Sequence, residues 1–498
     1  MRVKRFRGPV VALAIAALAY GLGPRGAIGA ERDAAVERPW LNAALSPDER
    51  ARLLERAMTL DEKIGLLHGK VGTAFRGAPM PEGAIGSAGY VAGIPRLGVP
   101  ALQESDAGLG VTNPSNARPG DAATALPASL ALAATWSPEL AYKSGVVIGT
   151  EARRKGINVM LAGGMNLARD PRNGRNFEYF GEDPLLAGTL AGEAVRGIQS
   201  QNVISTVKHF ALNDQETGRQ VLDARIAEDA FRESDLLAFE IAIERGKPGS
   251  IMCAYNRVNG DYACGNDWLL NRVLKGDWKY PGWVMSDWGA VHDVGYALKG
   301  LDQESGEQID SQVFFAEPLE RAVAAGTVPQ ARISDMVRRV LRSMFAAGLF
   351  DAPDARGAID FDAHARDAQQ VAEQAIVVLR NERATLPLAR TTKRIAVIGG
   401  YAAAGVISGG GSSQVYPVGG PAAVVPLGGE GQFSFWRAIN LHPSSPLRAI
   451  RALLAEGGEA VFDDGRYPRE AARLAATADV AIVFAIQWMS ENFDAPDL

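Results

Sequence analysis

Five short apolar segments, separated by helical patterns, constrain the fold more than any other feature of the sequence. None of them alternates polar and apolar residues, which is typical of strands buried on both faces. Alternating strands and helices predict a parallel α/β architecture, and the length of the region suits a (β/α)8 TIM-like barrel better than a single doubly wound sheet. The expected strands are Val99–Gln103, Ile157–Leu161, Val203–Val207, Ser250–Cys253 and Trp283–Ser286.

A second α/β region follows the barrel and begins with an apolar strand at Ile395–Ile398. A glycine-rich loop, SGGGSSQV, precedes the next helix, and long loops of this kind are usually functional or disordered. Only three strands are expected here, so one face of their sheet would stay uncovered. We therefore expect a partial α/β sandwich domain that is incomplete at the C-terminus. Its further elements are a helix at 446–455, a strand at 460–462, a helix at 469–476 and a strand at 480–486.

The N-terminus has the pattern of a secretory signal peptide over residues 1–30. Four basic residues precede an apolar run from Val10 to Leu22, which is too short to span a bilayer comfortably. An uncleaved anchor is the alternative. The pattern predicts a periplasmic or secreted protein without stable membrane anchoring after cleavage. The expected domains are then a barrel at 31–365, a linker helix and loop at 366–390, with the helix at QVAEQAIVVLRNE, and the sandwich at 391–498.

Cys253 and Cys264 are the only cysteines in the chain. An Asn-Gly pair between them can turn the chain back on itself, so a disulfide is expected in an oxidising compartment, with free thiols as the alternative. Two cysteines alone make a poor metal site. The sequence also lacks an HExxH motif, a Cys/His cluster, a calcium loop and a GxGxxG fingerprint, so neither a metal nor a cofactor is predicted. Acids and bases are interspersed, with a net charge of -5, which excludes a nucleic-acid partner.

Polar and ionisable residues follow every predicted barrel strand. They occur in LQESDAG, LARDPRNGRNFEYFGEDP, KHFALND, AYNRVNG and SDWGA. Barrel enzymes assemble their sites at the carboxyl ends of the strands, so these side chains should meet at one rim. Asp287 at such an end can instead cap a helix, and a Lys-His pair such as Lys208 and His209 can simply be a solvated strand end. The aromatic rings of Tyr255 and Trp288 suit either a pyranose face or core packing.

Several of these motifs together resemble the glycoside hydrolase family 3 β-glucosidases. The motifs are ESDAG, RDPRNGRNFEYFGEDP, KHFALNDQE and WVMSDW in the family's order, followed by GGGSSQV and VFAIQWMSENFDAPDL. The resemblance extends from about Leu60 to the C-terminus. It implies a TIM-like barrel followed by an α/β sandwich, an active site where the two domains meet, and retaining hydrolysis of β-linked glycosides.

The resemblance also implies residue roles. Asp287 matches the family nucleophile, and Glu491 matches the acid/base, although Asn492 stands where glycine commonly follows it. Glu491 as a solvated acid in a terminal loop is the alternative. Retention requires two carboxyl groups about 5–5.5 Å apart, one ionised and one protonated, so we expect an ionised Asp287 and a protonated Glu491 near neutral pH. The residues that match those holding or packing on the sugar are Asp106, Arg175, Lys208, His209, Tyr255 and Trp288.

These features together predict a retaining exo-acting β-glucosidase. Its substrates would be β-linked oligosaccharides or aryl and alkyl β-glucosides, and Asp106 favours a sugar with further hydroxyls to hold. A β-xylosidase or another family 3 β-glycosidase is the alternative within the enzymes. A saccharide-binding fragment without catalysis is the alternative outside them. The sequence makes no prediction about oligomeric state.

Overall fold

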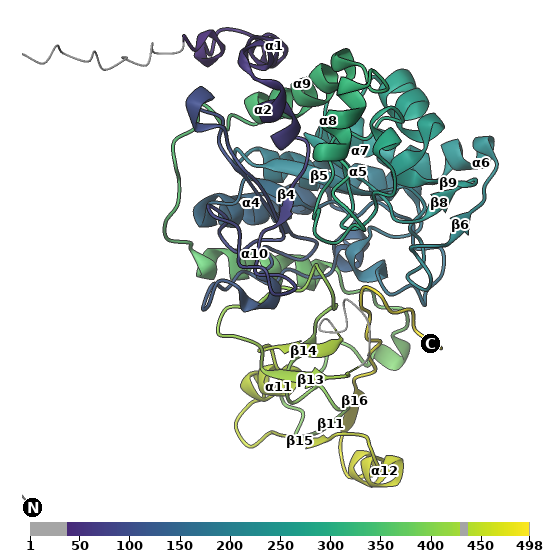
Figure 1. Cartoon of the computed structure of the whole chain (residues 1–498). Helices are drawn as coiled ribbons and strands as arrows, with labels where there is room; N and C mark the ends of the chain where they lie inside the picture. Colours follow the sequence, from purple (N-terminus) through teal and green to yellow (C-terminus); the bar gives the residue numbers. More distant parts are fainter. Residues whose placement is uncertain (1–36, 429–436, 498) are drawn as a thin grey trace, which may run out of the picture. The chain divides into compact units, whose positions relative to one another are not determined.

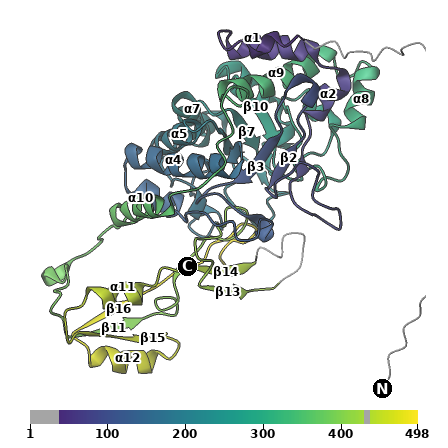
Figure 2. The same cartoon turned by 90° about the vertical axis from the view of Figure 1, so that its left-hand side faces the viewer.

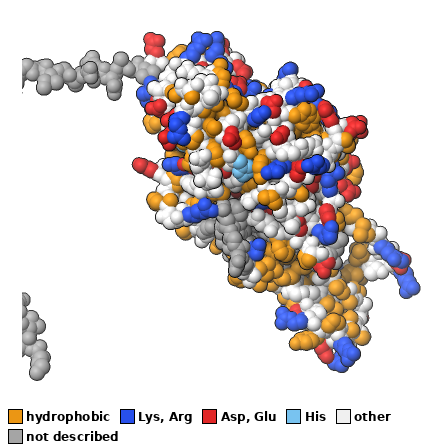
Figure 3. Space-filling model, turned by 45° about the vertical axis from the view of Figure 1, so that its right-hand side comes forward, with side chains coloured by type: hydrophobic (Ala, Val, Ile, Leu, Met, Phe, Trp, Pro, Cys, Tyr) orange, Lys and Arg blue, Asp and Glu red, His pale blue; other side chains and the backbone are white. Residues whose placement is uncertain are grey.

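The computed structural model describes residues 37–428 and 437–497 (Figure 1). The predicted signal peptide at residues 1–30 lies outside these ranges. Within them, none of the helices combines the length and the apolar character that crossing a bilayer requires. Figure 3 shows acidic and basic side chains interspersed over one face of the molecule, in keeping with the small net charge.

A seven-stranded sheet forms the centre of the first part of the chain. From β3 onward neighbouring strands are parallel, whereas β2 is antiparallel to both of its neighbours. The strands, in their order across the sheet, are β1 (Lys70–Val71), β2 (Gly89–Val91), β3 (Leu102–Asp106), β4 (Val159–Leu161), β5 (Ile204–Phe210), β7 (Ser250–Cys253) and β10 (Trp283–Ser286).

A short segment at residues 303–304 closes this sheet into a ring. The amide of Ser286 donates to the carbonyl of Gln303 at 2.9 Å, and the amide of Glu304 donates to the carbonyl of Leu67 at 2.9 Å. The amide of Gly69 returns a bond of 2.8 Å to Glu304. With this eighth position the predicted TIM-like barrel is confirmed. The barrel differs from a regular (β/α)8 barrel in β2, which runs antiparallel to its neighbours. Antiparallel strands can be joined without a helical crossover, so the chain can pass from β1 through β2 to β3 by loops.

Helices cover the outside of the barrel (Figure 1). α4 (Pro138–Lys155) and α5 (Pro184–Gln199) pack so closely that a Cβ on Gly145 would lie only 2.1 Å from the carbonyl oxygen of Ala194. Ser137 and Asp183 cap these two helices. The other helices of this part are α1 (Pro47–Ala57), α2 (Leu60–Gly65), α3 (Ser129–Ala134), α6 (Glu228–Glu233), α7 (Asp235–Gly246), a π-helix (Trp268–Asp277), α8 (Glu317–Ala324) and α9 (Gln330–Ala346). A small sheet of β6 (Asp223–Ala224), β8 (Arg257–Val258) and β9 (Asp261–Tyr262) lies among the loops.

The predicted linker helix is displaced in the structure. α10 (Phe361–Gln374) begins earlier, where Asp360 accepts a bond of 2.9 Å from the amide of Ala363, and it ends before the run 376–379. This run is exposed and not helical. Its β-branched residues lose side-chain freedom in a helix, which explains why the apolar pattern failed as a helix signal. The domain boundaries around it stay a prediction.

A second sheet belongs to the predicted sandwich. Its parallel strands, in the order β15 (Glu459–Asp463), β11 (Arg394–Ile398) and β16 (Val480–Val483), match the three expected strands. Figure 2 shows α11 (Pro446–Leu453) and α12 (Pro468–Ala476) on opposite faces of this sheet. Alternate residues of β11 accordingly pack on one helix or the other: Val397 lies in the cluster with Leu447, and Ala396 in the cluster with Ala471.

The stretch between β11 and α11, expected to be one long loop, contains a further sheet. β14 (Ala438–His442) pairs in antiparallel fashion with both β12 (Val406–Ile407) and β13 (Ala423–Pro426). The glycine-rich part of this stretch, residues 408–415, contains no strand. It lies against the segment that carries Glu491, since the amide of Gly410 donates to the carbonyl of Met489 at 3.0 Å.

Candidate active site

All eight residues predicted for catalysis or sugar binding line one cavity of about 440 Å³. Most of them come from the carboxyl ends of barrel strands. Asp106 ends β3, Lys208 and His209 lie near the end of β5, and Asp287 directly follows β10. Glu491 reaches the same cavity from the C-terminal segment, beside the glycine-rich loop. The predicted residues brought together here are Asp106, Arg175, Lys208, His209, Tyr255, Asp287, Trp288 and Glu491.

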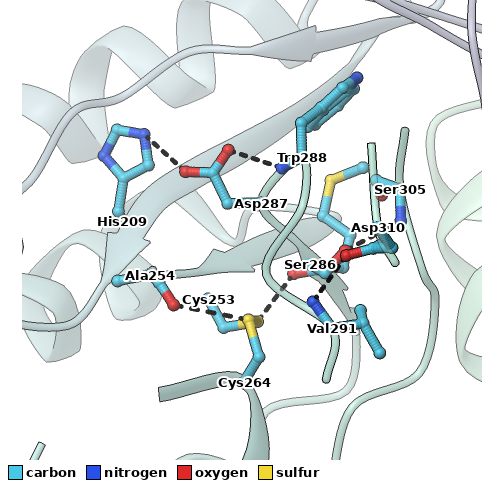
Figure 4. Close-up of a disulfide and its surroundings, with 11 residues drawn as sticks. His209, Cys253, Ala254, Cys264, Ser286, Asp287, Trp288, Val291, Ser305 and Asp310 are labelled. Atoms are coloured by element: carbon cyan, nitrogen blue, oxygen red, sulfur yellow. Dashed lines mark hydrogen bonds and ion pairs between the residues drawn. A yellow bond between two sulfur atoms is a disulfide. The ribbon is translucent and has the colours of Figure 1, made fainter. Parts of the chain in front are cut away.

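Asp287 lines this cavity, and one of its carboxylate oxygens lacks a hydrogen bond. Its Oδ1 accepts a bond of 2.8 Å from the amide of Trp288, while its Oδ2 lies 3.6 Å from Nε2 of His209 (Figure 4). Among the described residues Oδ2 has no hydrogen-bond partner. The helix-cap interpretation of Asp287 is wrong, because the next helical turn begins only at Val294 and is capped by Asp293. Asp287 therefore has an oxygen available for a ligand.

Opposing effects act on the charge of Asp287. Burial raises its pKa, and the carboxylate of Glu491 acts in the same direction, whereas Arg219, Arg175 and Lys208 lower it. The net pKa is higher than that of an ordinary aspartate. The three cations therefore offset the effect of burial only in part.

His209 is neutral in this environment. Burial lowers its pKa well below the ordinary value, and the positive charges of Arg175, Lys208 and Arg219 lower it further. The side chain of Asn166 fixes its backbone, because Nδ2 donates to the carbonyl of His209 at 3.0 Å and Oδ1 accepts from its amide at 2.9 Å. A neutral imidazole can donate one hydrogen bond toward Asp287 or a sugar hydroxyl without adding a positive charge to the site.

Lys208 and Asp106 form a buried ion pair in the cavity wall. Nζ of Lys208 donates to Oδ1 of Asp106 at 2.8 Å. Burial disfavours the charged lysine, yet the charges of Asp106 and Glu178 raise the pKa of Lys208 above its ordinary value. For Asp106 burial is the stronger effect, so its pKa is raised although Lys208 opposes this. A pair of this kind offers both a donor and an acceptor to sugar hydroxyls.

Arg175 is held by its own loop and reaches toward Glu491. Its Nε donates to Oε1 of Glu178 at 2.5 Å, and its Nη1 lies 3.7 Å from Oε1 of Glu491. Nη2 is buried and has no hydrogen-bond partner within the described chain. Asn173 supports the loop, since its Oδ1 accepts from the amide of Arg175 at 3.2 Å. The free Nη2 donor is a further group that a ligand in the cavity can satisfy.

Glu491 is a buried, ion-paired carboxylate, so its interpretation as a solvated terminal acid is wrong. Its Oε1 accepts from Nη2 of Arg219 at 2.9 Å, and its Oε2 accepts from the amide of Ser412 at 2.8 Å. Burial opposes ionisation, but Arg175, Arg219 and the hydrogen bonds from Ser412 lower the pKa of Glu491 well below its usual range. The expectation that Glu491 keeps its proton near neutral pH is therefore wrong for this arrangement. The two arginines are the reason.

The backbone around Glu491 is tightly fitted. Asn492 has φ 67°, a left-handed conformation that favours glycine and tolerates asparagine, which accounts for Asn at the position where glycine is common. Gly411 of the glycine-rich loop lies so close that an added Cβ would come within 2.3 Å of Cβ of Glu491. The loop therefore forms one wall of the Glu491 site.

Tyr255 and Trp288 are fixed at the edge of the cavity. The hydroxyl of Tyr255 donates to the carbonyl of Trp288 at 3.0 Å, and Nε1 of Trp288 donates to the carbonyl of Ala88 at 3.2 Å. A disulfide joins Cys253 at the end of β7 to Cys264, and the loop between them carries Tyr255 (Figure 4). This cross-link restrains the strand end from which Tyr255 enters the site.

Three residues at the site were missed from the sequence. Arg219 is buried and its Cζ lies 4.5 Å from the ring centroid of Tyr255, while Glu216 accepts from its Nη1 at 2.9 Å. Ser412 contributes the amide that binds Glu491. The spacing of Glu216 and Arg219 is the signal that could have indicated this pair. Within residues 37–428 and 437–497, no group of three or more His, Cys, Asp or Glu side chains is arranged to hold a metal ion.

Comparison with known proteins identifies the family. The sequence profile of the glycosyl hydrolase family 3 N terminal domain matches residues 91–343, and that of the family's C-terminal domain matches residues 376–498. The chain belongs to glycosyl hydrolase family 3. The matched ranges contain all eight residues of the site.

Three relatives match this chain over 63–70% of its length. A β-glucosidase of Bacteroides ovatus is 39% identical over 63% of this chain and 45% of its own length. The thermostable β-glucosidase B of Acetivibrio thermocellus is 35% identical over 70% of this chain and 44% of its own. An exo-α-(1→6)-L-arabinopyranosidase of Bifidobacterium longum is also 35% identical, over 69% and 45%. The chain thus spans less than half the length of these relatives.

Solved structures of family 3 members share the fold. A β-glucosidase from Streptomyces venezuelae in complex with D-glucose has a TM-score of 0.70 at 35% identity, covering 84% of this chain and 50% of that one. β-Glucosidase 3B from Thermotoga neapolitana in complex with glycerol has a TM-score of 0.75 at 31% identity, covering 89% and 63%.

Proposed function

We propose that this chain carries the catalytic site of a retaining, exo-acting β-glucosidase that hydrolyses terminal β-D-glucosyl residues. The observation that carries the proposal is the unbonded Oδ2 of Asp287, which faces the same cavity as the carboxylate of Glu491. Family membership and the β-glucosidases among the relatives support the substrate class.

In the proposed reaction Oδ2 of Asp287 attacks the anomeric carbon and forms a glycosyl ester, while the glycosidic oxygen leaves with a proton from Glu491. Water then attacks the ester, gives its proton to Glu491, and releases the sugar and Asp287. The resting ion pairs of Glu491 suit its role as base in the second step. For the first step Glu491 must take up a proton, which requires that a bound substrate or a shifted side chain loosen its bonds to Arg175 and Arg219.

The buried polar wall of the cavity supports the proposed recognition of a chain end. Asp106, Lys208 and Arg175 are all buried and supply donors and acceptors at fixed positions. Such groups are well suited to the several hydroxyls of one terminal sugar and would reject a sugar that left them unpaired. The ring of Trp288 provides an apolar face beside them.

A second candidate substrate is a pentopyranoside. A relative at 35% identity is named an exo-α-(1→6)-L-arabinopyranosidase, and pentopyranosides lack the exocyclic CH₂OH group of glucose. Family 3 chemistry with a pentopyranoside, including a β-xyloside, would use the same two carboxylates. The alternative that is not an enzyme is a protein that binds saccharides without hydrolysing them.

We also propose that the protein is exported, as a periplasmic or secreted enzyme. The basic and apolar pattern of residues 1–30 supports export, and the disulfide between Cys253 and Cys264 suits an oxidising compartment. Cell fractionation with detection of the processed N-terminus tests this. Recovery of the unprocessed chain in the cytoplasm would contradict it.

Hydrolysis of aryl glycosides tests the catalytic proposal directly. The chain should release the phenol from an aryl β-D-glucoside faster than from the matching β-D-xyloside and α-L-arabinopyranoside. D287N should lose this activity by at least about 10³-fold while keeping its melting temperature. D354N is the matched control, because Asp354 pairs with Arg356 at the surface. Binding of glucose or cellobiose by calorimetry without hydrolysis would instead indicate a binding protein.

A further inference from the structure

Asp494 does not line the cavity of the proposed reaction, but it is close in sequence to Glu491, which does. It follows Glu491 by three residues, and it lines a second cavity of about 750 Å³ together with the loops at 169–173 and 212–217. Because Asp494 faces this other cavity, any effect on the reaction must pass through the residues that its hydrogen bonds hold in place.

The carboxylate of Asp494 accepts backbone hydrogen bonds from two separate barrel loops. Its Oδ1 accepts from the amide of Gly174 at 3.0 Å and from that of Glu216 at 3.1 Å. Its Oδ2 accepts from the amide of Glu216 at 3.1 Å and from that of Thr217 at 2.7 Å. These amides lower the pKa of Asp494 although burial opposes them, which is the behaviour of an ionised acceptor.

These two loops are the ones that carry the arginines around Glu491. Gly174 directly precedes Arg175, whose Nη1 lies 3.7 Å from Glu491. Glu216 accepts from Nη1 of Arg219, and Nη2 of the same guanidinium donates to Glu491. One carboxylate therefore holds both arginine loops and the segment of Glu491 in a single arrangement.

Further contacts seat the same segment. The amide of Asn492 donates to Oε2 of Glu216 at 2.7 Å, and the amide of Ala495 donates to the carbonyl of Arg172 at 2.8 Å. The fit is close, since a Cβ on Gly174 would lie 2.0 Å from the carbonyl oxygen of Phe493. Asp494 supplies the only carboxylate of residues 492–496, and hydrogen bonds to a charged acceptor are stronger than those to a neutral one.

We propose that Asp494 is a positioning residue, which fixes Glu491 relative to Arg175 and Arg219 and thereby sets its ability to transfer a proton. The proposal rests on the proposed role of Glu491 as acid/base. Without the carboxylate of Asp494, the segment 490–496 loses its bonds to the amides of Gly174, Glu216 and Thr217, and Glu491 is held less firmly in position to meet the glycosidic oxygen. Asp287 keeps its hydrogen bond from the amide of Trp288, so attack on the anomeric carbon should change less than proton transfer does.

This selective loss has a kinetic signature. A poor leaving group such as phenolate needs the proton from Glu491, whereas 2,4-dinitrophenolate leaves without one. General acid assistance contributes typically about 10²–10⁴-fold in rate. In D494A, kcat/KM for phenyl β-D-glucoside should fall by about 10-fold or more relative to that for 2,4-dinitrophenyl β-D-glucoside. D494N keeps one acceptor oxygen and should show a smaller change in this ratio.

A matched control is offered by Asp479, which also accepts from two backbone amides. Its Oδ2 accepts from the amides of Lys393 at 3.1 Å and Arg394 at 2.9 Å, at the start of β11. D479A should lower the melting temperature without changing the ratio of the two rates. Hydrogen exchange of the peptides covering 173–177, 214–219 and 488–497 provides a readout independent of activity, and it should increase in D494A and not in D479A.

The outcomes separate this proposal from the function on which it rests. Faster exchange in all three peptides of D494A, with a changed ratio of rates, supports the positioning role. Unchanged exchange and an unchanged ratio in an active D494A or D494N overturn it. The unmutated chain could hydrolyse no glycoside while exchange still increases in D494A. The catalytic proposal then fails, and with it the role of Asp494 in proton transfer. Asp494 would only stabilise the position of the segment.

Discussion

Nη2 of Arg219 donates a hydrogen bond of 2.9 Å to the carboxylate of Glu491, which lies 272 positions further along the chain. This bond brings the loop after β5 to the C-terminal segment and buries both charged groups. It also explains why Glu491 is ionised here, since two arginines compensate its charge. The protonation of the proposed acid is thus controlled by the barrel.

R219M removes one of these two cations, and the pKa of Glu491 should rise because burial then acts with less opposition. In the pH profile of kcat for phenyl β-D-glucoside, which reports the enzyme–substrate complex in which Glu491 carries its proton, the alkaline limb should move upward by about one pH unit or more. R225M is the control, because Arg225 is exposed and pairs with Asp223. An alkaline limb that stays in place in R219M would mean that Glu491 is not the titrating acid.

G411A should impair catalysis through direct contact with Glu491. Gly411 has φ 102°, and an added Cβ would come within 2.3 Å of Cβ of Glu491. Gly419 has φ 82° with open space around it, so G419A carries a similar left-handed cost, about 1–2 kcal/mol, without the clash. We expect a much larger loss of kcat in G411A than in G419A at similar melting temperatures. Equal losses would show that the contact with Glu491 does not matter.

Removing the disulfide should destabilise the site more than the barrel core. Cys253 and Cys264 are 11 positions apart, and closing a loop of this size stabilises a protein by about 3 kcal/mol in the chain-entropy account. The double variant C253A/C264A should therefore unfold at lower urea concentration. KM should rise as well, because Tyr255 lies in the freed loop. The unmutated chain must first be shown by mass spectrometry to contain the disulfide. If the double variant then has the same urea midpoint as this chain, the prediction is contradicted.

The buried carboxyl of Glu104 should make stability depend on pH. Burial, with a contribution from Asp106, raises the pKa of Glu104 to about 8. The unfolded chain has a value of about 4.3, so the folded state binds more protons between these two values and its stability falls as pH rises through this window, by up to about 1.4 kcal/mol per pH unit. E104Q lacks this titration. Its stability advantage should grow from pH 5 to pH 8 in urea unfolding, and a constant difference would refute the assignment.

The sequence predicted the barrel and the strand-end residues because the acids and bases lie at or just after the ends of apolar strands. Asp106, Lys208, His209 and Asp287 could be placed at one rim on this basis alone. β2 could not be predicted to run in reverse, since a three-residue strand carries no signal of direction. The helix expected at 370–382 was displaced because its apolar run is β-branched and its true start is the cap at Asp360.

The electrostatics of the site could not be predicted from the strand pattern. Arg219 lies in a loop nine residues past β5, and its proximity to Glu491 depends on how the C-terminal segment folds back. The same holds for Ser412 and Asp494, which act through backbone hydrogen bonds. Glu491 was expected to be protonated but is ionised. The expectation was wrong because the arginines that compensate its charge, Arg175 and Arg219, are distant from it in sequence.

Trapping with 2,4-dinitrophenyl 2-deoxy-2-fluoro-β-D-glucoside tests the central claim most directly, because the fluorine slows both formation and hydrolysis of a glycosyl ester, while the good leaving group keeps formation fast enough for the ester to accumulate. Peptide mapping of the inactivated chain should find one fluoroglucosyl group, on the peptide that contains Asp287, and none in D287N. A chain that hydrolyses β-glucosides but carries the label on another residue, or forms no adduct at all, would contradict the assignment of Asp287 as nucleophile.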